Sequence, residues 1–394
     1  MGTVVVKKGR AKPLWRGHPW VFRDSVARIE GDPSGGDLVG VSDDGGRPIG
    51  AGFWSPESRI AVRILAAEAD VPTDRAFFAE RIERAVRLRR ETLELPVVTD
   101  AYRVVHSEGD LLPGLVVDHF AGHLVVQFST LGMHRRREAI LDALEEVLAP
   151  RSIHETPDRR ACRLEGIETE GGLVRGRAPD EPPSILEHGV CFRIGLARGQ
   201  KTAFYADQRD NRELVARMAR DRSVLDIHTY TGGFGLYAAV NGAETVLGID
   251  SSGPALALAV ENAMLNHGRQ MRFERGDATR ALNALHAEGR SFDIVVCDPP
   301  PFARVRAHVP RALRAHKDLH LRAIRVVRPG GLLAVSSCSG AVGDADFERT
   351  LREAAGDVGR SVQVLHRGGQ APDHPVLLTC PEGRYLKFLL ACVA

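Results

Sequence analysis

The stretch Ser223–Asp250, SVLDIHTYTGGFGLYAAVNGAETVLGID, decides the fold of its part of the chain. A short apolar run ends at Asp226, a turn occupies 229–233, and a helical pattern fills 234–240. A second apolar run ends at Asp250. This order predicts a strand, a glycine-containing loop, a helix and a second strand. An acid about 20 positions beyond such a loop can accept hydrogen bonds from ribose hydroxyls, so we expect a ligand that contains a nucleoside.

The loop itself narrows the class of ligand. It lacks the G-x-G-x-x-G pattern of dinucleotide sites, and the chain has no G-x-x-x-x-G-K-[ST] for a nucleoside triphosphate. A cofactor with a ribose and an adenine but no phosphates remains, and S-adenosylmethionine fits that description. Glycine turns and strand-end acids also occur in parallel α/β domains that bind nothing, so the loop alone leaves both interpretations open.

Length and composition set the outer bounds. A chain of 394 residues is longer than one hydrophobic core usually organises, which predicts two or three domains. No apolar run reaches the length of a membrane span, and no secretion signal is visible at the N-terminus. The six cysteines show no C-x-x-C pairing. We therefore expect a cytoplasmic protein with reduced thiols, no structural metal and no membrane partner.

Positive charge is concentrated at the N-terminus, although the net charge of the whole chain is only +2. No acid precedes Asp24, and three aromatic residues, Trp15, Trp20 and Phe22, are interleaved with the cations. Cations for phosphates beside aromatic faces for bases are typical of an RNA-binding edge. A solvated basic strand over a small core is the alternative. The candidate RNA-binding residues are Lys7, Lys8, Arg10, Lys12, Arg16 and Trp20.

Residues 1–70 contain short strand patterns separated by Gly, Asp and Pro turns, which predict a small β-barrel-like module. The module resembles a PUA domain through KKGR (7–10), HPWVF (18–22) and SPESRIAVRIL (55–65). This resemblance implies binding to RNA.

Residues 73–188 form a middle segment with a mixed α+β pattern, and no set of side chains in it indicates a chemical site. We predict a helix over 73–93, with Thr73 as its N-cap and its arginines on a solvated face. A β-meander is expected over 101–128 and a second helix over 133–148. Further strands are expected over 156–190.

Residues 189–394 alternate strands with helices, which predicts a doubly wound parallel sheet closed by two final strands. Ligands of such sheets bind beyond the carboxyl ends of the strands. In the run 199–212, Asp207 is expected to cap a helix over 208–218. Phe204 and Gln208 would then lie beside the strand ends.

The stretch DPPPF (298–302) follows a predicted strand. Prolines stiffen the turn, while the carboxylate of Asp298 and the ring of Phe302 offer a planar base one hydrogen-bond partner and one stacking face. Cys338 lies in SSCS, where the next strand should end. A pyrimidine becomes nucleophilic at C5 when a thiolate adds to C6, and an acid near N3 stabilises the charge that develops. Cys338 and Asp298 could supply these groups, although most free cysteines are simply small buried residues.

Several stretches together resemble the bacterial PUA-containing class I methyltransferases that make 5-methylcytosine in 23S ribosomal RNA. They are HPWVF (18–22), AYRVVHSEGDLLPGLVVD (101–118), GQKTAFYADQRDNR (199–212), YTGGF (230–234), CDPPPF (297–302), HKDLH (316–320), SSCS (336–339) and APDHPVLLTCPEGRYLK (371–387). The resemblance implies Cys338 as nucleophile, Lys317 as an RNA contact, and ribosomal RNA or a large-subunit precursor as partner. The implied S-adenosylmethionine contacts are Asp226, Tyr230, Gly232, Asp250, Asp277 and Asp298, beside Phe204 and Gln208.

Other functions stay open at this point. Methylation of a base nitrogen needs no thiol, and a non-catalytic RNA-binding assembly factor needs no turnover. A nicotinamide oxidoreductase is disfavoured by the missing phosphate-binding glycines. Pro301 stands where related proteins often have lysine, and Cys297 is expected to be a core residue. The oligomeric state is open, with a homodimer as one candidate.

Overall fold

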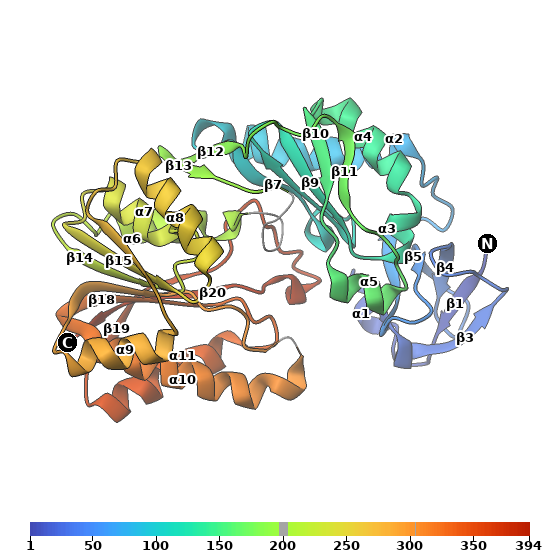
Figure 1. Ribbon diagram of the computed structural model, residues 1–394. Coiled ribbons are helices and arrows are strands. Elements are labelled where there is room, and N and C mark those ends of the chain that lie inside the picture. Colours follow the sequence, from blue (N-terminus) through green and yellow to red (C-terminus); the bar gives the residue numbers. More distant parts are fainter. Residues whose placement is uncertain (197–203, 304) are drawn as a thin grey trace. The chain divides into compact units, whose positions relative to one another are not determined.

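The computed structural model describes residues 1–196, 204–303 and 305–394 (Figure 1). These residues form two compact units. The first comprises Met1–Ile185, Ile194–Ala206 and Pro372–Gly383, and the second comprises Leu186–Arg193, Asp207–Ala371 and Arg384–Ala394. Residues 372–383 therefore pack with the first unit, although in the sequence they fall within the predicted third domain. None of the described helices is long and apolar enough to cross a membrane.

The N-terminal part of the first unit is a six-stranded sheet of order β2-β6-β5-β4-β1-β3. Five of its strands lie where alternation predicts them, and β3 was not expected because most of its side chains are exposed. Valines of β1 and β4 and Trp54 of β5 form its core. The elements are β1 (Thr3–Val6), α1 (Lys12–Trp15), β2 (Trp20–Phe22), η1 (Arg23–Ser25), β3 (Val26–Glu30), β4 (Leu38–Ser42), β5 (Pro48–Trp54) and β6 (Ile60–Ala66).

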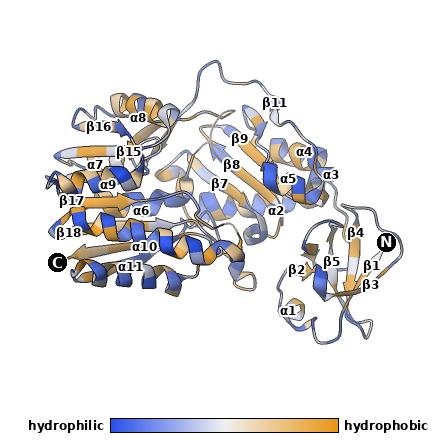
Figure 2. Cartoon of the chain, turned by 60° about the horizontal axis from the view of Figure 1, so that its bottom comes forward, coloured by the Kyte–Doolittle hydropathy of each residue, from blue (hydrophilic) through white to orange (hydrophobic). Residues whose placement is uncertain are grey.

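The middle segment is a five-stranded sheet of order β11-β10-β9-β8-β7 with helices packed on it. The predicted meander is confirmed as β7, β8 and β9, whose apolar residues are visible in Figure 2. The elements are α2 (Arg75–Arg87), η2 (Leu88–Thr92), η3 (Leu95–Val97), β7 (Ala101–His106), η4 (Ser107–Asp110), β8 (Leu115–Phe120), β9 (His123–Phe128), α3 (Leu131–Arg135), α4 (Arg137–Leu148), β10 (Ser152–Glu155), α5 (Arg159–Glu165) and β11 (Gly172–Gly176).

The second unit contains a seven-stranded sheet of order β16-β15-β14-β17-β18-β20-β19. Its first five strands are parallel, and β20 runs antiparallel to both of its neighbours. The doubly wound sheet closed by the last two strands is thus confirmed. The strands are β14 (Ser223–Ile227), β15 (Thr245–Asp250), β16 (Met271–Arg275), β17 (Phe292–Cys297), β18 (Val327–Ser337), β19 (Val362–Gly368) and β20 (Lys387–Val393), and a separate pair is β12 (Ser184–Glu187) with β13 (Val190–Arg193).

Helices cover both faces of this sheet. In Figure 1, α6, α7 and α8 lie on one face and α9, α10 and α11 on the other. The sequence did not lead us to expect α9 and α11. The helices are η5 (Ala206–Gln208), α6 (Arg209–Ala216), α7 (Gly233–Val240), α8 (Gly253–Leu265), α9 (Ala278–Ala287), η6 (Arg306–His308), α10 (Val309–Val326) and α11 (Asp344–Val358), and η7 (Pro381–Gly383) belongs to the first unit.

Two expectations for the helix over 73–93 are wrong. The N-cap is Asp74 rather than Thr73, because the Asp74 carboxylate accepts a hydrogen bond from the Phe77 N–H at 3.0 Å. Arg89 is not solvated but completely buried, since its guanidinium pairs with both carboxylate oxygens of Asp110 at 2.5 and 2.8 Å. It also donates to the carbonyl oxygen of Asp373 at 2.6 Å. Arg89 therefore ties residues 372–383 into the first unit.

Replacing Arg89 with methionine should strongly destabilise the first unit, because Asp110 is left buried without its cation. Breaking a buried pair in this way costs about 3–5 kcal/mol. All three tryptophans (Trp15, Trp20 and Trp54) lie in the first unit, so tryptophan fluorescence in a urea titration reports on that unit alone. The control is Arg84→Ala, at an exposed position of α2. Equal urea midpoints for both variants would contradict this account.

Candidate active site

The site begins at the end of β14, where Asp226 holds the following loop. Its side chain is buried, and its Oδ2 accepts hydrogen bonds from the Thr229 hydroxyl at 2.6 Å and the Gly235 N–H at 2.9 Å. Burial, opposed by these two hydrogen bonds, raises the pKa of the Asp226 carboxyl to about 7. Asp226 thus shapes the loop from beneath, and its direct contact with the cofactor stays a prediction.

The loop above Asp226 has an unusual backbone. His228, Tyr230 and Gly232 have φ angles of 62°, 52° and 90°. Left-handed conformations cost about 1 kcal/mol or more in residues other than glycine, and such strain persists where the surroundings enforce it, often at functional sites. Asn262 helps to enforce it by donating to the Thr231 carbonyl oxygen at 3.2 Å. The loop then enters α7 at Gly233 without a side-chain cap.

Asp250 joins this loop to the end of the neighbouring strand, β15. Its Oδ2 accepts from the Tyr230 N–H at 3.0 Å, and its Oδ1 accepts from the Ser252 N–H at 2.8 Å. Two residues predicted to contact the cofactor therefore lie side by side. Asp277 follows β16 and is exposed, and its carboxylate caps α9 through the Arg280 N–H at 3.0 Å. Its predicted contact with the cofactor stays a prediction.

Asp298 follows β17 and is oriented from two sides. Its Oδ1 accepts from Gln208 Nε2 at 3.0 Å and also from the Ser336 hydroxyl on β18. Gln208 is itself fixed, because its Oε1 accepts from Asn211 Nδ2 at 2.7 Å. The sequence placed Gln208 beside the strand ends, and the structure joins it directly to the Asp298 carboxylate. Ser336 and Asn211 were missed, since nothing local in the sequence marks them as partners of Asp298.

Cys338 lies one residue beyond β18 and is half-buried. Its Sγ is 3.8 Å from the carbonyl oxygen of Pro299, which directly follows Asp298. This contact brings the thiol to the turn that follows Asp298, and the joint role of Cys338 and Asp298 stays a prediction. The ring of Phe302 was expected to offer a stacking face to a base. It packs instead against the apolar core, and its centroid lies 4.7 Å from that of the His316 ring, so protein contacts already cover part of the ring.

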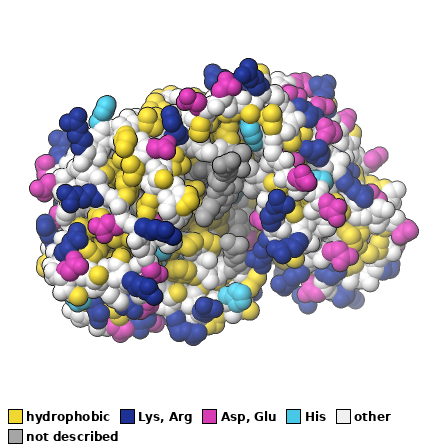
Figure 3. Space-filling view, viewed as in Figure 1, with side chains coloured by type: hydrophobic (Ala, Val, Ile, Leu, Met, Phe, Trp, Pro, Cys, Tyr) yellow, Lys and Arg dark blue, Asp and Glu magenta, His cyan; other side chains and the backbone are white. Residues whose placement is uncertain are grey.

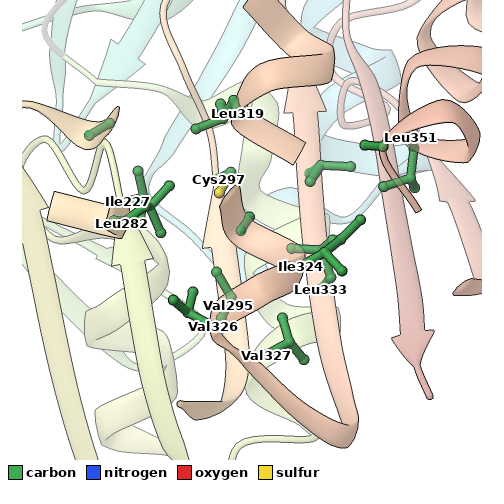
Figure 4. Packing of buried hydrophobic residues seen from close by; sticks show 14 of the residues in the cluster. Ile227, Leu282, Val295, Cys297, Leu319, Ile324, Val326, Val327, Leu333 and Leu351 are labelled. Atoms are coloured by element: carbon green, nitrogen blue, oxygen red, sulfur yellow. The ribbon is translucent and has the colours of Figure 1, made fainter. Parts of the chain in front are cut away.

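Cys297 is a core residue, as expected. It is 1% exposed and belongs to the apolar cluster beneath β17, where Figure 4 shows it among Ile227, Val295 and Leu319. Burial, reinforced by the negative charges of Asp226 and Asp298, raises the pKa of its thiol well above the ordinary value. A thiol in this state is a poor nucleophile and a poor proton carrier.

Three other predicted residues have different surroundings from those expected. Asp207 does not cap a helix: it lies in η5, α6 starts at Arg209, and its carboxylate accepts from the Tyr385 hydroxyl at 2.6 Å. Phe204 is buried but belongs to the first unit, and residues 199–203 of the same motif lie outside the described residues. Lys317, on α10, is paired with Asp357 at 2.9 Å. The roles of Phe204 and Lys317 stay predictions.

In the N-terminal module the predicted cations, Lys7, Lys8, Arg10, Lys12 and Arg16, are all exposed. The aromatic residues divide differently. Trp20 is half-buried and its indole N–H donates to Glu108 at 2.8 Å, so it anchors the module to the middle segment. Trp15 and Phe22 are 48% and 39% exposed, and Arg47 lies over the Trp15 ring at 5.2 Å. On the face of the molecule shown in Figure 3, basic and acidic side chains are intermixed.

One group of side chains in the described residues has the spacing of a metal site. His18, Cys380 and Glu382 place one potential ligand atom each within 4.8 Å of one another. The Nδ1 of His18 accepts the Trp20 N–H at 3.2 Å, so the ring proton lies on Nε2, which faces Glu382 at 3.4 Å. A metal needs a lone pair at that nitrogen. The group is therefore a hydrogen-bonded cluster.

Replacing Asp226 with asparagine should remove one component of the pH dependence of stability. The pKa of about 7 in the folded protein exceeds the ordinary value of 3.8. Between these two pH values the native state binds more protons than the unfolded state, so the free energy of unfolding falls as pH rises through this range. Asparagine keeps the acceptor oxygen and cannot ionise. Thermal unfolding followed by circular dichroism from pH 5 to 8 should give a stability difference, variant minus parent, that increases with pH. A constant difference would contradict the raised pKa.

Comparisons with known proteins identify the family of the chain. Residues 170–382 match the model of an S-adenosylmethionine-dependent methyltransferase family, and residues 4–67 match a PUA-like domain. The proteins named ribosomal RNA large subunit methyltransferase I of Tolumonas auensis and Aeromonas salmonicida are 39% and 38% identical, over 98% of each chain. A solved methyltransferase from Streptococcus mutans has a TM-score of 0.86 over 100% of both chains at 18% identity, which supports the fold. The chain therefore belongs to the S-adenosylmethionine-dependent methyltransferases, in the family of ribosomal RNA large subunit methyltransferase I.

Proposed function

We propose that this enzyme methylates C5 of a cytosine in large-subunit ribosomal RNA through a covalent adduct with Cys338. The names of its relatives support ribosomal RNA as the substrate. The observation that carries the choice of C5 is the 3.8 Å contact between Cys338 Sγ and the Pro299 carbonyl oxygen. It brings a half-buried thiol to the same turn as Asp298, which is the pair of groups that C5 chemistry requires. Such an RNA substrate would place the reaction in the cytoplasm.

The proposed reaction uses these two groups in sequence. The Cys338 thiolate adds to C6, while the Asp298 carboxyl group donates a hydrogen bond to N3, where negative charge develops. S-adenosylmethionine supplies the methyl group, which bonds to C5 as the methyl–sulfur bond breaks. The C5 proton then leaves to solvent, the C6–sulfur bond breaks, and its electron pair returns to Cys338. Gln208 and Ser336 hold the Asp298 side chain in one orientation through hydrogen bonds to its Oδ1.

A second candidate is methylation of a base nitrogen, because a D-P-P-F turn also suits enzymes that act on exocyclic amines. In that reaction Cys338 would have no chemical role. A non-catalytic RNA-binding assembly factor is the third candidate, and S-adenosylmethionine binding would be dispensable for it. The thiol at the D-P-P turn favours the first candidate, since neither of the others needs it there.

Cys338→Ala should abolish methyl transfer, because no other group in this turn can add to C6. RNA containing 5-fluorocytosine should form a denaturant-resistant complex with the parent enzyme, since fluorine at C5 cannot leave as the proton does. The variant should form no such complex and should still bind S-adenosylmethionine in calorimetry.

The outcomes separate the candidates. Near-parent turnover by Cys338→Ala would favour a nitrogen-directed enzyme. A parent protein that does not bind S-adenosylmethionine would favour the assembly factor. Mass mapping of 5-methylcytosine in ribosomal RNA from a deletion strain identifies the target, and an unchanged map would remove support for the proposal.

The N-terminal module is proposed to bind RNA through its exposed cations and through Trp15 and Phe22. Exposed aromatic faces can stack on bases, whereas the Trp20 indole is engaged with Glu108. Base stacking contributes about 1–3 kcal/mol per base, so Trp15→Ala or Phe22→Ala should raise the Kd for ribosomal RNA about fivefold or more. Fluorescence anisotropy measures this. Ile29→Ala, at an exposed apolar position on β3, is the control. Loss of binding in Trp20→Phe alone would instead support the assignment made from the sequence.

A further inference from the structure

A buried lysine lies next to the proposed nucleophile. Lys387 is the first residue of β20, where it pairs with Ser337 of the antiparallel strand β18. Only 3% of it is exposed. Its Nζ donates to the carbonyl oxygen of Ser339 at 2.7 Å and to that of Tyr385 at 3.0 Å. Because Ser339 directly follows Cys338, the lysine fixes the short segment that carries the thiol.

The surroundings of Lys387 make its ammonium group easier to deprotonate than that of an ordinary lysine. Burial, with Arg384 nearby, lowers the pKa of its ammonium to about 8, and Asp344 and Cys338 act in the opposite direction. On α10, burial and the lysine charge lower the pKa of His316 to about 4, so His316 is neutral near pH 7. The lysine also lines a cavity of about 110 Å³ whose walls include Arg367, Glu348 and the ion-paired Arg384 and Asp344.

We propose that Lys387 is a positioning residue that orders the Cys338 segment and stabilises the thiolate with its ammonium group. The inference rests on the proposed function for its catalytic meaning, but the effect on the thiol does not depend on it. A cation beside a cysteine favours the nucleophilic thiolate. Two backbone carbonyls hold the ammonium in place, so it acts on the sulfur from a fixed position.

The effect has a defined pH range. Lys387 carries its charge below about pH 8 and loses it above, so the thiolate is stabilised most near and below neutral pH. Lys387→Met removes the charge at every pH. Lys387→Arg retains it. Asp344→Asn removes the carboxylate that favours the ammonium, and should weaken the effect while leaving the lysine in place.

The test is the rate at which iodoacetamide alkylates Cys338, resolved by mass spectrometry, from pH 6 to 10 in the full chain. The pH midpoint should rise by about one unit in Lys387→Met, which is about a tenfold lower thiolate fraction at neutral pH. It should rise less in Asp344→Asn and stay near the parent value in Lys387→Arg. Arg367→Met removes a cation from the same cavity without touching the Cys338 segment and is the matched control.

Activity gives an independent readout. In Lys387→Met, kcat at pH 7 should fall about tenfold and recover partly at higher pH, with KM for RNA nearly unchanged. Equal alkylation midpoints in the parent, Lys387→Met and Asp344→Asn would overturn the inference, and Asp344→Asn keeps this test valid if the methionine variant does not fold. Full activity of Cys338→Ala would instead overturn the proposed function, while the alkylation profile would still decide the effect of Lys387 on the thiol.

Discussion

The site depends on the register of three parallel strands. In the pairing of β14 with β17, Asp226 is opposite Val296, and in the pairing of β17 with β18, Cys297 is opposite Val335. The next residues along, Asp298 and Ser336, are therefore neighbours, and the Ser336 hydroxyl donates to the Asp298 carboxylate. A slip of one residue would turn every side chain to the other face of the sheet. The hydrophobic cores on both faces prevent that slip, so the core of the sheet fixes the geometry of its edge.

The antiparallel direction of β20 explains how a residue far along the chain reaches this edge. Parallel strands present only their carboxyl ends there, so their first residues lie at the opposite edge. An antiparallel strand presents its amino end instead, and Lys387 is the first residue of β20. The same feature brings Tyr385, just before the strand, to Asp207 at the start of the helical segment before β14. One reversed strand thus adds a cation and a phenol to an edge that otherwise carries strand-end acids and a thiol.

Local patterns predicted most of this fold, and long-range partners account for two of the errors. Alternation and helical spacing depend on neighbours in sequence, so the strands of the second unit and the acids that follow them could be placed. Arg89 looked like part of a solvated charge run because its partner, Asp110, is 21 residues away and enters from η4. Trp20 looked like a stacking residue because Glu108 is 88 residues away. In both cases the partner that the fold supplies is distant in the sequence.

Cys297 and Cys338 illustrate how a shift of one position at the end of a strand changes the surroundings of a thiol. Both lie at the carboxyl ends of adjacent strands, but Cys297 is the last residue within β17 whereas Cys338 lies one residue beyond β18. This difference of one position decides the surroundings of each side chain. Inside the strand the side chain enters the apolar cluster, and burial beside two carboxylates opposes ionisation of the thiol. Beyond the strand the thiol is half-buried and its following residue is bonded to a buried ammonium group. The two thiols therefore differ both in exposure and in the charges around them, and this difference supports the proposal that Cys338 rather than Cys297 attacks the pyrimidine ring.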